Sequence, residues 1–240
     1  MAAVIALSTA GTACSTETRT VERTPAQGAS ATAAGGEVAR PVSAGASAPP
    51  RVVLLGTSLT AGLGLNPDDA YPALLQRKAD SAGYAVRMVN AGLSGETSAG
   101  ALRRAGWVLD QPAALVVLEV GANDGLRGVD PDSTYANLVA LIGVVRAQRP
   151  DAVVALVQME APPNLGQGYT RRFHAVYGRA ASATGVPLLP FLLDGVAGDA
   201  RLNQADGIHP NRDGSVRVAE TVWRGLAPLL TQLSPPPGRR

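Results

Sequence analysis

The sequence is poor in cysteine, lysine, histidine and aromatic residues, and each shortage limits what the chain can be. The single cysteine, Cys14, excludes an intramolecular disulfide and a metal site built from several cysteines. Lysine occurs only at Lys78 and the net charge is +2, so no basic stripe with interleaved aromatic residues is available to bind nucleic acid. Aromatic residues make up only 4%, so a core must consist mainly of alanine, valine and leucine. The 240 residues suit one soluble globular domain.

Residues 1–14 form a short apolar segment that ends in small residues and Cys14, and residues 15–50 are rich in serine, threonine, alanine, glycine and proline. This order resembles a bacterial lipoprotein leader with an acylated cysteine and a disordered tether. It departs from such leaders at Gly11, where leucine is usual, and it lacks basic residues before the apolar run. We predict an exported protein that is periplasmic, secreted or, with lipid attachment at Cys14, anchored to the membrane. The alternative is a disordered N-terminal extension of a cytoplasmic protein with an incidental cysteine.

From residue 51 to residue 233 the sequence alternates between short apolar runs and longer segments with helical spacing of leucine and alanine. This alternation predicts one domain, a three-layer α/β/α sandwich around a parallel sheet of about five strands. The proline-rich residues 234–240 are expected to be a disordered tail. The expected strands are 51–56, 84–92, 113–121, 152–159 and 186–191, and the expected helices are 70–83, 96–111, 131–149, 169–185 and 212–233.

Polar groups follow several of these strands, where function gathers in a parallel α/β sheet. The first, "GTSLTAGLG" at 56–64, has the glycines of a phosphate-binding loop but neither a Gly-Lys-Ser/Thr nor a G-x-G-x-x-G pattern. A dinucleotide-binding site also requires an acidic residue at the end of the second strand, and this sequence has Asn90 there. These observations argue against nucleotide binding and leave the hydroxyl groups of this segment as the feature to explain.

A catalytic serine needs a base, and the chain has only two histidines. His174 lies in the middle of an expected helix, where a structural role is the simpler interpretation. His209 lies in a Gly/Pro loop three residues after Asp206, a spacing that lets the carboxylate orient the imidazole toward a hydroxyl. The alternative for "DGIHPN" at 206–211 is a turn that caps the last helix.

Acyl transfer also requires donors for the developing oxyanion. The "SGET" segment at 94–97 opens an expected helix, so the glycine N–H of Gly95 would be exposed there and assisted by the helix dipole. Asn123, just past the end of a buried strand, offers a side-chain amide. The alternative for Asn123 is a turn residue in "ANDG".

Four blocks together carry a resemblance: "LLGTSLTAGLG", "NAGLSGETS", "LEVGANDGLRG" and "DGIHPNRDG". In this order and at these separations, residues 51–233 resemble the SGNH (GDSL-like) hydrolases, and within them the arylesterase, thioesterase I and lysophospholipase branch. The resemblance implies a flavodoxin-like sandwich. It implies Ser58 as nucleophile, His209 as general base and then acid, and Asp206 as the residue that orients His209. The N–H groups of Ser58 and Gly95 and the side chain of Asn123 would form the oxyanion hole.

One departure concerns the first block, which in this family usually reads Gly-Asp-Ser-Leu and here has Thr57 in place of the aspartate. That aspartate is not the acid of the triad, so we expect a differently organised loop with activity retained. Leu63, Leu65 and the loop 161–169 are expected to flank the cleft and to suit an acyl chain or an aromatic ring.

The sequence therefore predicts a monomeric serine hydrolase that cleaves carboxylic esters of short to medium acyl chains through an acyl-enzyme. Its expected partner is a small ester or acyl substrate, with no cofactor, no metal and no nucleic acid. Within the enzyme class, the alternatives are a thioesterase, a lysophospholipase and, ranked lower, an enzyme that removes acetyl groups from sugars. From a different class, the alternative is a non-catalytic binding module, with Thr57 as an early sign of decay.

Overall fold

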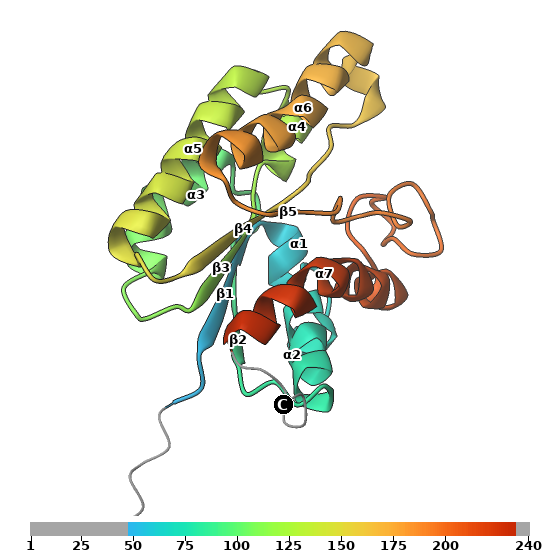
Figure 1. Ribbon diagram of the computed structural model, residues 1–240. Helices are drawn as coiled ribbons and strands as arrows, with labels where there is room; N and C mark the ends of the chain where they lie inside the picture. Colours follow the sequence, from blue (N-terminus) through green and yellow to red (C-terminus); the bar gives the residue numbers. More distant parts are fainter. Residues whose placement is uncertain (1–47, 234–240) are drawn as a thin grey trace, which may run out of the picture. The chain divides into compact units, whose positions relative to one another are not determined.

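The computed structural model describes residues 48–233, and its centre is a five-stranded parallel sheet in the order β2-β1-β3-β4-β5 (Figure 1). The predicted α/β class and the strand number are thereby confirmed. The predictions on residues 1–47, including Cys14, and on residues 234–240 lie outside the described part. The strands are β1 (Arg51–Gly56), β2 (Arg87–Gly92), β3 (Leu115–Glu119), β4 (Val153–Val157) and β5 (Leu188–Leu189).

Helices cover both faces of the sheet, as the three-layer prediction requires (Figure 1). The helices α2 and α7 pack together on one face, and α3, α5 and α6 pack in a row on the other. None of the helices in residues 48–233 is long and apolar enough to cross a membrane. The helices are α1 (Ser58–Ala61), α2 (Tyr71–Ser81), α3 (Ser98–Val108), α4 (Ala122–Arg127), α5 (Pro131–Gln148), α6 (Gln167–Thr184) and α7 (Arg212–Leu233), with short 3-10 turns η1 (Pro67–Asp69) and η2 (Pro163–Leu165).

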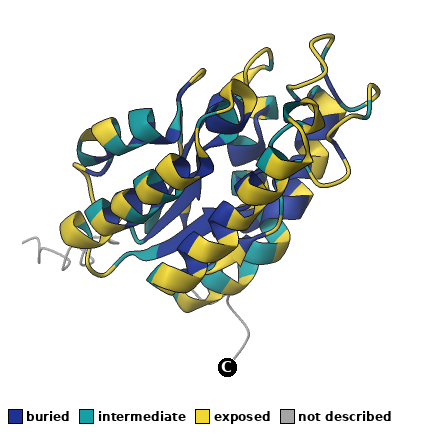
Figure 2. Cartoon of the chain, turned by 90° about the horizontal axis from the view of Figure 1, so that it is seen from above, coloured by how far each residue is buried: buried dark blue, intermediate teal, exposed yellow. Residues whose placement is uncertain are grey.

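The core lies between the sheet and the two helical layers (Figure 2). All of β3 is buried, as is β1 from Val52 onward, which matches the continuous apolar runs expected of strands covered on both faces. The edge strand β2 is only half-buried. Figure 2 shows dark blue strands between helices whose outer sides are exposed. The carboxyl ends of β1 and β3 are therefore the rigid base on which the polar loops lie.

The structure corrects several expected boundaries. The second strand begins at Arg87 rather than residue 84, and the fifth is only Leu188–Leu189, because Pro187 and Pro190 lack the N–H that a longer ladder needs. The "ANDG" segment forms the short helix α4 instead of a simple turn. The helix expected to open at residue 96 begins at Ser98, with Thr97 as its N-cap.

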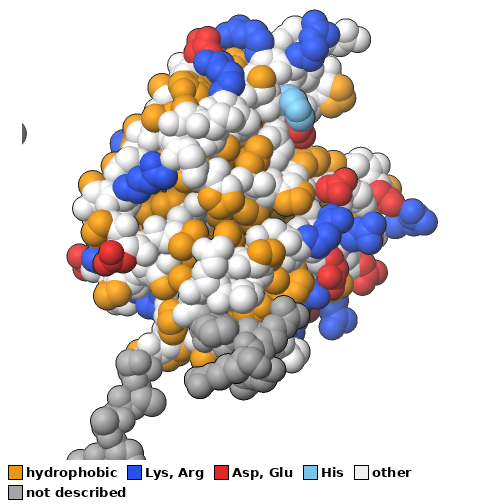
Figure 3. Space-filling model, in the orientation of Figure 1, with side chains coloured by type: hydrophobic (Ala, Val, Ile, Leu, Met, Phe, Trp, Pro, Cys, Tyr) orange, Lys and Arg blue, Asp and Glu red, His pale blue; other side chains and the backbone are white. Residues whose placement is uncertain are grey.

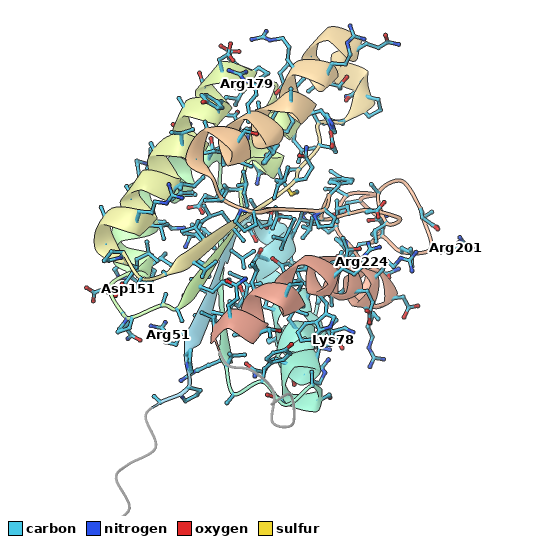
Figure 4. The ribbon with its side chains drawn as sticks, in the orientation of Figure 1. Arg51, Lys78, Asp151, Arg179, Arg201 and Arg224 are labelled. Atoms are coloured by element: carbon cyan, nitrogen blue, oxygen red, sulfur yellow. The ribbon has the colours of Figure 1, made fainter. Side chains whose placement is uncertain are left out.

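Ion pairs tie neighbouring helices together at the surface, as the labelled side chains of Figure 4 help to locate. Lys78 on α2 pairs with Glu220 on α7, and Arg179 on α6 donates to Asp132 on α5 at 3.0 Å. The Arg179 guanidinium also lies 4.5 Å from the centre of the Tyr135 ring. Exposed pairs of this kind contribute up to about 1 kcal/mol each, so burial of the sheet is the main source of stability.

Candidate active site

Ser58 lies at the carboxyl end of β1 because the chain turns sharply there. A Cβ added to Gly56 would lie 2.1 Å from the Thr60 hydroxyl and 2.6 Å from a Glu119 carboxyl oxygen, so only glycine fits. Thr57 follows as the N-cap of α1, and Ser58 is the first residue of that helix. The Ser58 residue is only 7% exposed, so its hydroxyl is held in a confined place at the edge of the sheet.

The loop before α7 brings His209 and Asp206 to this serine. His209 Nε2 lies 2.8 Å from Ser58 Oγ, and His209 Nδ1 lies 2.6 Å from Asp206 Oδ2. The three side chains thus form one continuous hydrogen-bonded row, although Ser58 and His209 are far apart in sequence. This is the geometry in which an imidazole accepts a hydroxyl proton on one nitrogen while a carboxylate holds the other.

The loop 206–211 also makes the turn that was its alternative interpretation. Asp206 Oδ1 accepts hydrogen bonds from the backbone N–H groups of Ile208 (2.9 Å) and His209 (3.0 Å), and Asn211 Oδ1 accepts from Gly214 N at the start of α7. The turn and the contact with His209 coexist because they use different oxygens of Asp206. Oδ1 accepts from the backbone of the turn, and Oδ2 contacts the His209 ring. Hydrogen bonds from the backbone and side chain of His209 lower the pKa of Asp206 to about 2, so it is ionised at any ordinary working pH.

His174 does not reach this site. It lies on α6 with an exposed side chain, and its Nδ1 is 2.6 Å from Glu160 Oε1. The pair is an exposed contact between α6 and the segment after β4. A structural role remains the better interpretation of His174.

Two of the predicted oxyanion donors, Gly95 and Asn123, lie on a loop and on helix α4, and these two segments are bonded to each other. Asn123 Nδ2, on α4, donates to the carbonyl of Glu96 at 3.0 Å, next to Gly95. Gly95 has φ +78°, a conformation that favours glycine. The expectation that Gly95 opens a helix is wrong, because α3 begins three residues later at Ser98. Its N–H therefore belongs to a turn and is not part of a helix N-terminus.

The loop that carries Gly95 is fixed from several sides. Arg104 Nε donates to Glu96 Oε1 at 2.7 Å and Arg104 Nη2 donates to Glu96 Oε2 at 2.6 Å, and this pair is largely buried. Arg127 donates to the Gly95 carbonyl at 3.0 Å. A bidentate arginine–carboxylate pair is geometrically specific, so it sets the loop's position relative to β1 and β2. No sequence pattern indicated a role for these residues in the site.

A small cavity adjoins Ser58 and His209. Leu63 and Leu65 contribute to it, as expected, and Tyr71, Leu192 and Val218 complete its apolar side. No residue of the loop 161–169 lines this cavity. The loop instead contacts α4, which carries Asn123, because Tyr169 Oη donates to the Asp124 carbonyl at 3.3 Å, and its place beside the cleft stays a prediction. Within residues 48–233, no group of three or more His, Cys, Asp or Glu side chains lies close enough to hold a metal ion.

Hydrophobic side chains reach the surface on the face of the molecule drawn in Figure 3. In Figure 3, hydrophobic side chains form a band across the middle of the face shown, and most charged side chains lie around its margin. On this face of the described chain, Lys and Arg do not form a continuous stripe. Two large hydrophobic residues close in sequence to the site are exposed. They are Leu63, which follows the helix that begins at Ser58, and Ile208, which precedes His209.

Comparisons with known proteins agree with the fold and give the family. The model of the GDSL-like Lipase/Acylhydrolase family matches residues 54–217. The chain is 43% identical over 180 residues to "Esterase TesA" of Pseudomonas aeruginosa, covering 75% of this chain and 89% of that one. It is 38% identical over 186 residues to "Thioesterase 1/protease 1/lysophospholipase L1" of Escherichia coli K12, covering 77% and 87%.

A solved structure is similar as well. The crystal structure of the psychrotrophic esterase EstA from Pseudoalteromonas sp., inhibited by monoethylphosphonate, superposes with a TM-score of 0.71 at 34% identity. The match covers 75% of this chain and 98% of that one. The chain therefore belongs to the GDSL-like lipase/acylhydrolase (SGNH) family, and it is an enzyme of the carboxylic ester hydrolase class.

Proposed function

We propose that this protein hydrolyses carboxylic esters through an acyl-enzyme formed on Ser58. The observation that carries the proposal is the row Ser58 Oγ, His209 Nε2, His209 Nδ1 and Asp206 Oδ2, with contacts of 2.8 and 2.6 Å. A chance arrangement would not place a buried serine, an imidazole and an ionised carboxylate in this order. The binding-module alternative is disfavoured because such a module has no use for this row.

The proposed reaction follows from that order of groups. Ser58 Oγ attacks the ester carbonyl carbon while His209 Nε2 takes the serine proton. The carbonyl oxygen becomes negative and accepts hydrogen bonds from the N–H groups of Ser58 and Gly95 and from Asn123 Nδ2. The alkoxy group leaves with the proton that His209 returns. Water then attacks the acyl-enzyme, with His209 again as base, and releases the acid and free Ser58.

Short to medium acyl chains and aryl esters are the proposed substrates. Leu63, Leu65 and Ile208 give the surroundings of Ser58 and His209 an apolar character, which supports a hydrophobic acyl or aryl group. Thioesters and lysophospholipids are the alternatives, and the relative named thioesterase 1/lysophospholipase L1 supports keeping them. Esters, thioesters and lysophospholipids would all react at Ser58, so the proposed chemistry at Ser58 is the same for each substrate class.

The substrate proposal predicts a maximum of kcat/KM at short or medium chain length. The measurement is a series of p-nitrophenyl esters of rising chain length, compared with acyl-CoA and lysophospholipid at equal chain length. We expect the p-nitrophenyl esters of short and medium acids to give the highest values. Higher values on acyl-CoA or on lysophospholipid would replace the arylesterase assignment with the corresponding alternative.

We also propose that the protein is exported, with Cys14 as a site of lipid attachment. The support is the order of the apolar residues 1–14 and the residues 15–50 that follow. Lipidation predicts a mature chain that begins at Cys14 with an added acyl mass, found in the membrane fraction. Mass spectrometry of the N-terminal peptide tests this, and any other mature N-terminus would contradict lipidation at Cys14.

A further inference from the structure

Glu119, the last residue of β3, is a fully buried carboxyl group at the end of an otherwise apolar strand. Its partners all belong to the segment that carries Ser58. Thr57 N donates to it at 2.9 Å, the Thr57 hydroxyl at 3.1 Å and the Thr60 hydroxyl at 2.7 Å. One carboxyl group thus holds the residue before Ser58 and the residue two positions after it.

The direction of these hydrogen bonds points to an ionised carboxylate. The Tyr71 and Thr60 hydroxyl oxygens lie 2.7 Å apart. Because Thr60 gives its hydrogen to Glu119, Tyr71 must donate to Thr60. Every donor in this row then points toward Glu119, whose two oxygens are both free to accept only when the group is ionised. A protonated Glu119 would need an acceptor of its own and would compete with Thr57 or Thr60 for one.

We propose that Glu119 is a positioning residue for ester hydrolysis: its carboxylate fixes the α1 turn and thereby keeps Ser58 Oγ in line with His209. The inference rests on the proposed role of Ser58. It follows from geometry, because α1 has only four residues and makes few internal hydrogen bonds. The bonds to Glu119 are the side-chain ties that hold Thr57 and Thr60 to the sheet. Misplacement of a nucleophile by about 1 Å can lower a rate about 100-fold.

The pH dependence of this arrangement has a definite sign. Burial raises the pKa of Glu119 to about 7, with the hydrogen bonds from Thr57 and Thr60 opposing the shift. The other titratable or charged groups that face it are Tyr71 of α2 and Tyr177 of α6, whose pKa values burial raises. Arg104 of α3 reaches the Gly56 carbonyl at 3.3 Å and is paired with Glu96. The positioned, ionised state therefore forms as the pH rises through about 7.

Folding stability changes in the opposite direction. The pKa of Glu119 is higher in the folded chain than its ordinary value of 4.5, so the folded state binds the proton more tightly. Its contribution to stability is present below pH 4.5 and is lost as the pH rises through about 7. Ionisation of Glu119 at the end of β3 therefore lowers the stability of the folded chain.

The test compares Glu119→Gln with Glu220→Gln, the same change at an exposed pair on α7. The readouts are the rate of Ser58 phosphonylation by a fluorophosphonate probe, and kcat and KM on a p-nitrophenyl ester, from pH 5 to pH 9. We expect Glu119→Gln to lower kcat and the phosphonylation rate about 10- to 100-fold with KM nearly unchanged. In wild type, ionisation of Glu119 should contribute to a rise of kcat with pH near pH 7. Glu119→Gln should lack this contribution. Glu220→Gln should match wild type.

Thr60→Val and Thr60→Ser keep the inference testable if Glu119→Gln does not fold. Valine removes the hydroxyl that bonds Glu119 at nearly constant shape, and serine restores it. We expect a lower phosphonylation rate for Thr60→Val and recovery with Thr60→Ser. Folded Glu119→Gln with the rates and pH profile of wild type, or Thr60→Val with the rate of wild type, would overturn the role of Glu119 and leave the proposed function standing. Absence of labelling in wild type would overturn the proposed function as well.

Discussion

Replacement of Ser58 by alanine is expected to lower kcat for ester hydrolysis by about 10⁴- to 10⁶-fold. The change removes the hydroxyl that is proposed to attack the carbonyl carbon and that lies 2.8 Å from His209 Nε2. Binding and the oxyanion donors remain, so some residual catalysis over water is expected. The measurement is kcat on a p-nitrophenyl ester with purified, folded protein.

The matched control is Ser182→Ala, the same change at an exposed position of α6. It should leave kcat at the wild-type value. Because Ser58 and His209 act as one unit, the double variant Ser58→Ala, His209→Ala should lose little beyond the single change. Hydrolysis by Ser58→Ala at a rate near that of wild type would contradict an acyl-enzyme formed on Ser58.

Replacement of Asn123 by alanine is expected to lower kcat by about 10²- to 10³-fold. The Asn123 amide is the one side chain among the proposed oxyanion donors, and it also donates to the Glu96 carbonyl at 3.0 Å. Alanine therefore removes a donor to the negative oxygen and one tie on the Gly95 loop. Since the donor acts mainly in the transition state, KM should change much less than kcat.

Asn66→Ala provides the control, because Asn66 is exposed and makes no side-chain capping bond. It should not change kcat. If Asn123→Ala raised KM while kcat stayed constant, Asn123 would serve in substrate binding and not in oxyanion stabilisation. Thermal unfolding of both variants shows whether loss of the Glu96 contact also loosens the fold.

The sequence could predict much of the fold because its apolar runs are short, continuous and separated by helical spacing. Val52 to Leu55 and Leu115 to Leu118 read as strands buried on both faces, and they are. The edges were harder to predict. β5 reads as a longer strand until the flanking Pro187 and Pro190 limit it to two residues. The helix at Asn123 also depends on tertiary contacts that local spacing does not report.

The candidate site was predictable where local spacing carries the geometry. Asp206 and His209 are three residues apart, so the turn that joins them also sets their contact. The distance from His209 to Ser58 depends on the whole sheet, and only the resemblance between motifs connected them. The expected flank at 161–169 stays a prediction: the loop lines no part of the small cavity beside Ser58, and its Tyr169 contacts α4, the helix that carries Asn123.

The supporting residues were missed because their partners are remote in sequence. Glu96 and Arg104 face each other only after α3 forms beside β1 and β2. Glu119 did leave a signal, since a carboxyl group at the end of the apolar run "LVVLE" is costly to bury without donors. The same contact explains Thr57, whose hydroxyl donates to Glu119 and whose oxygen accepts from Leu59 N. Thr57 therefore has a structural use in this loop.

Labelling with a fluorophosphonate probe, followed by mass spectrometry of the modified peptide, tests the central claim most directly. Such a probe reacts rapidly only with a serine that has both a base and oxyanion donors in place. We predict one phosphonyl adduct on Ser58 in wild type and no adduct in Ser58→Ala or in His209→Ala. An adduct on another residue, or a folded wild-type protein that stays unlabelled, would contradict the assignment of Ser58 as the nucleophile.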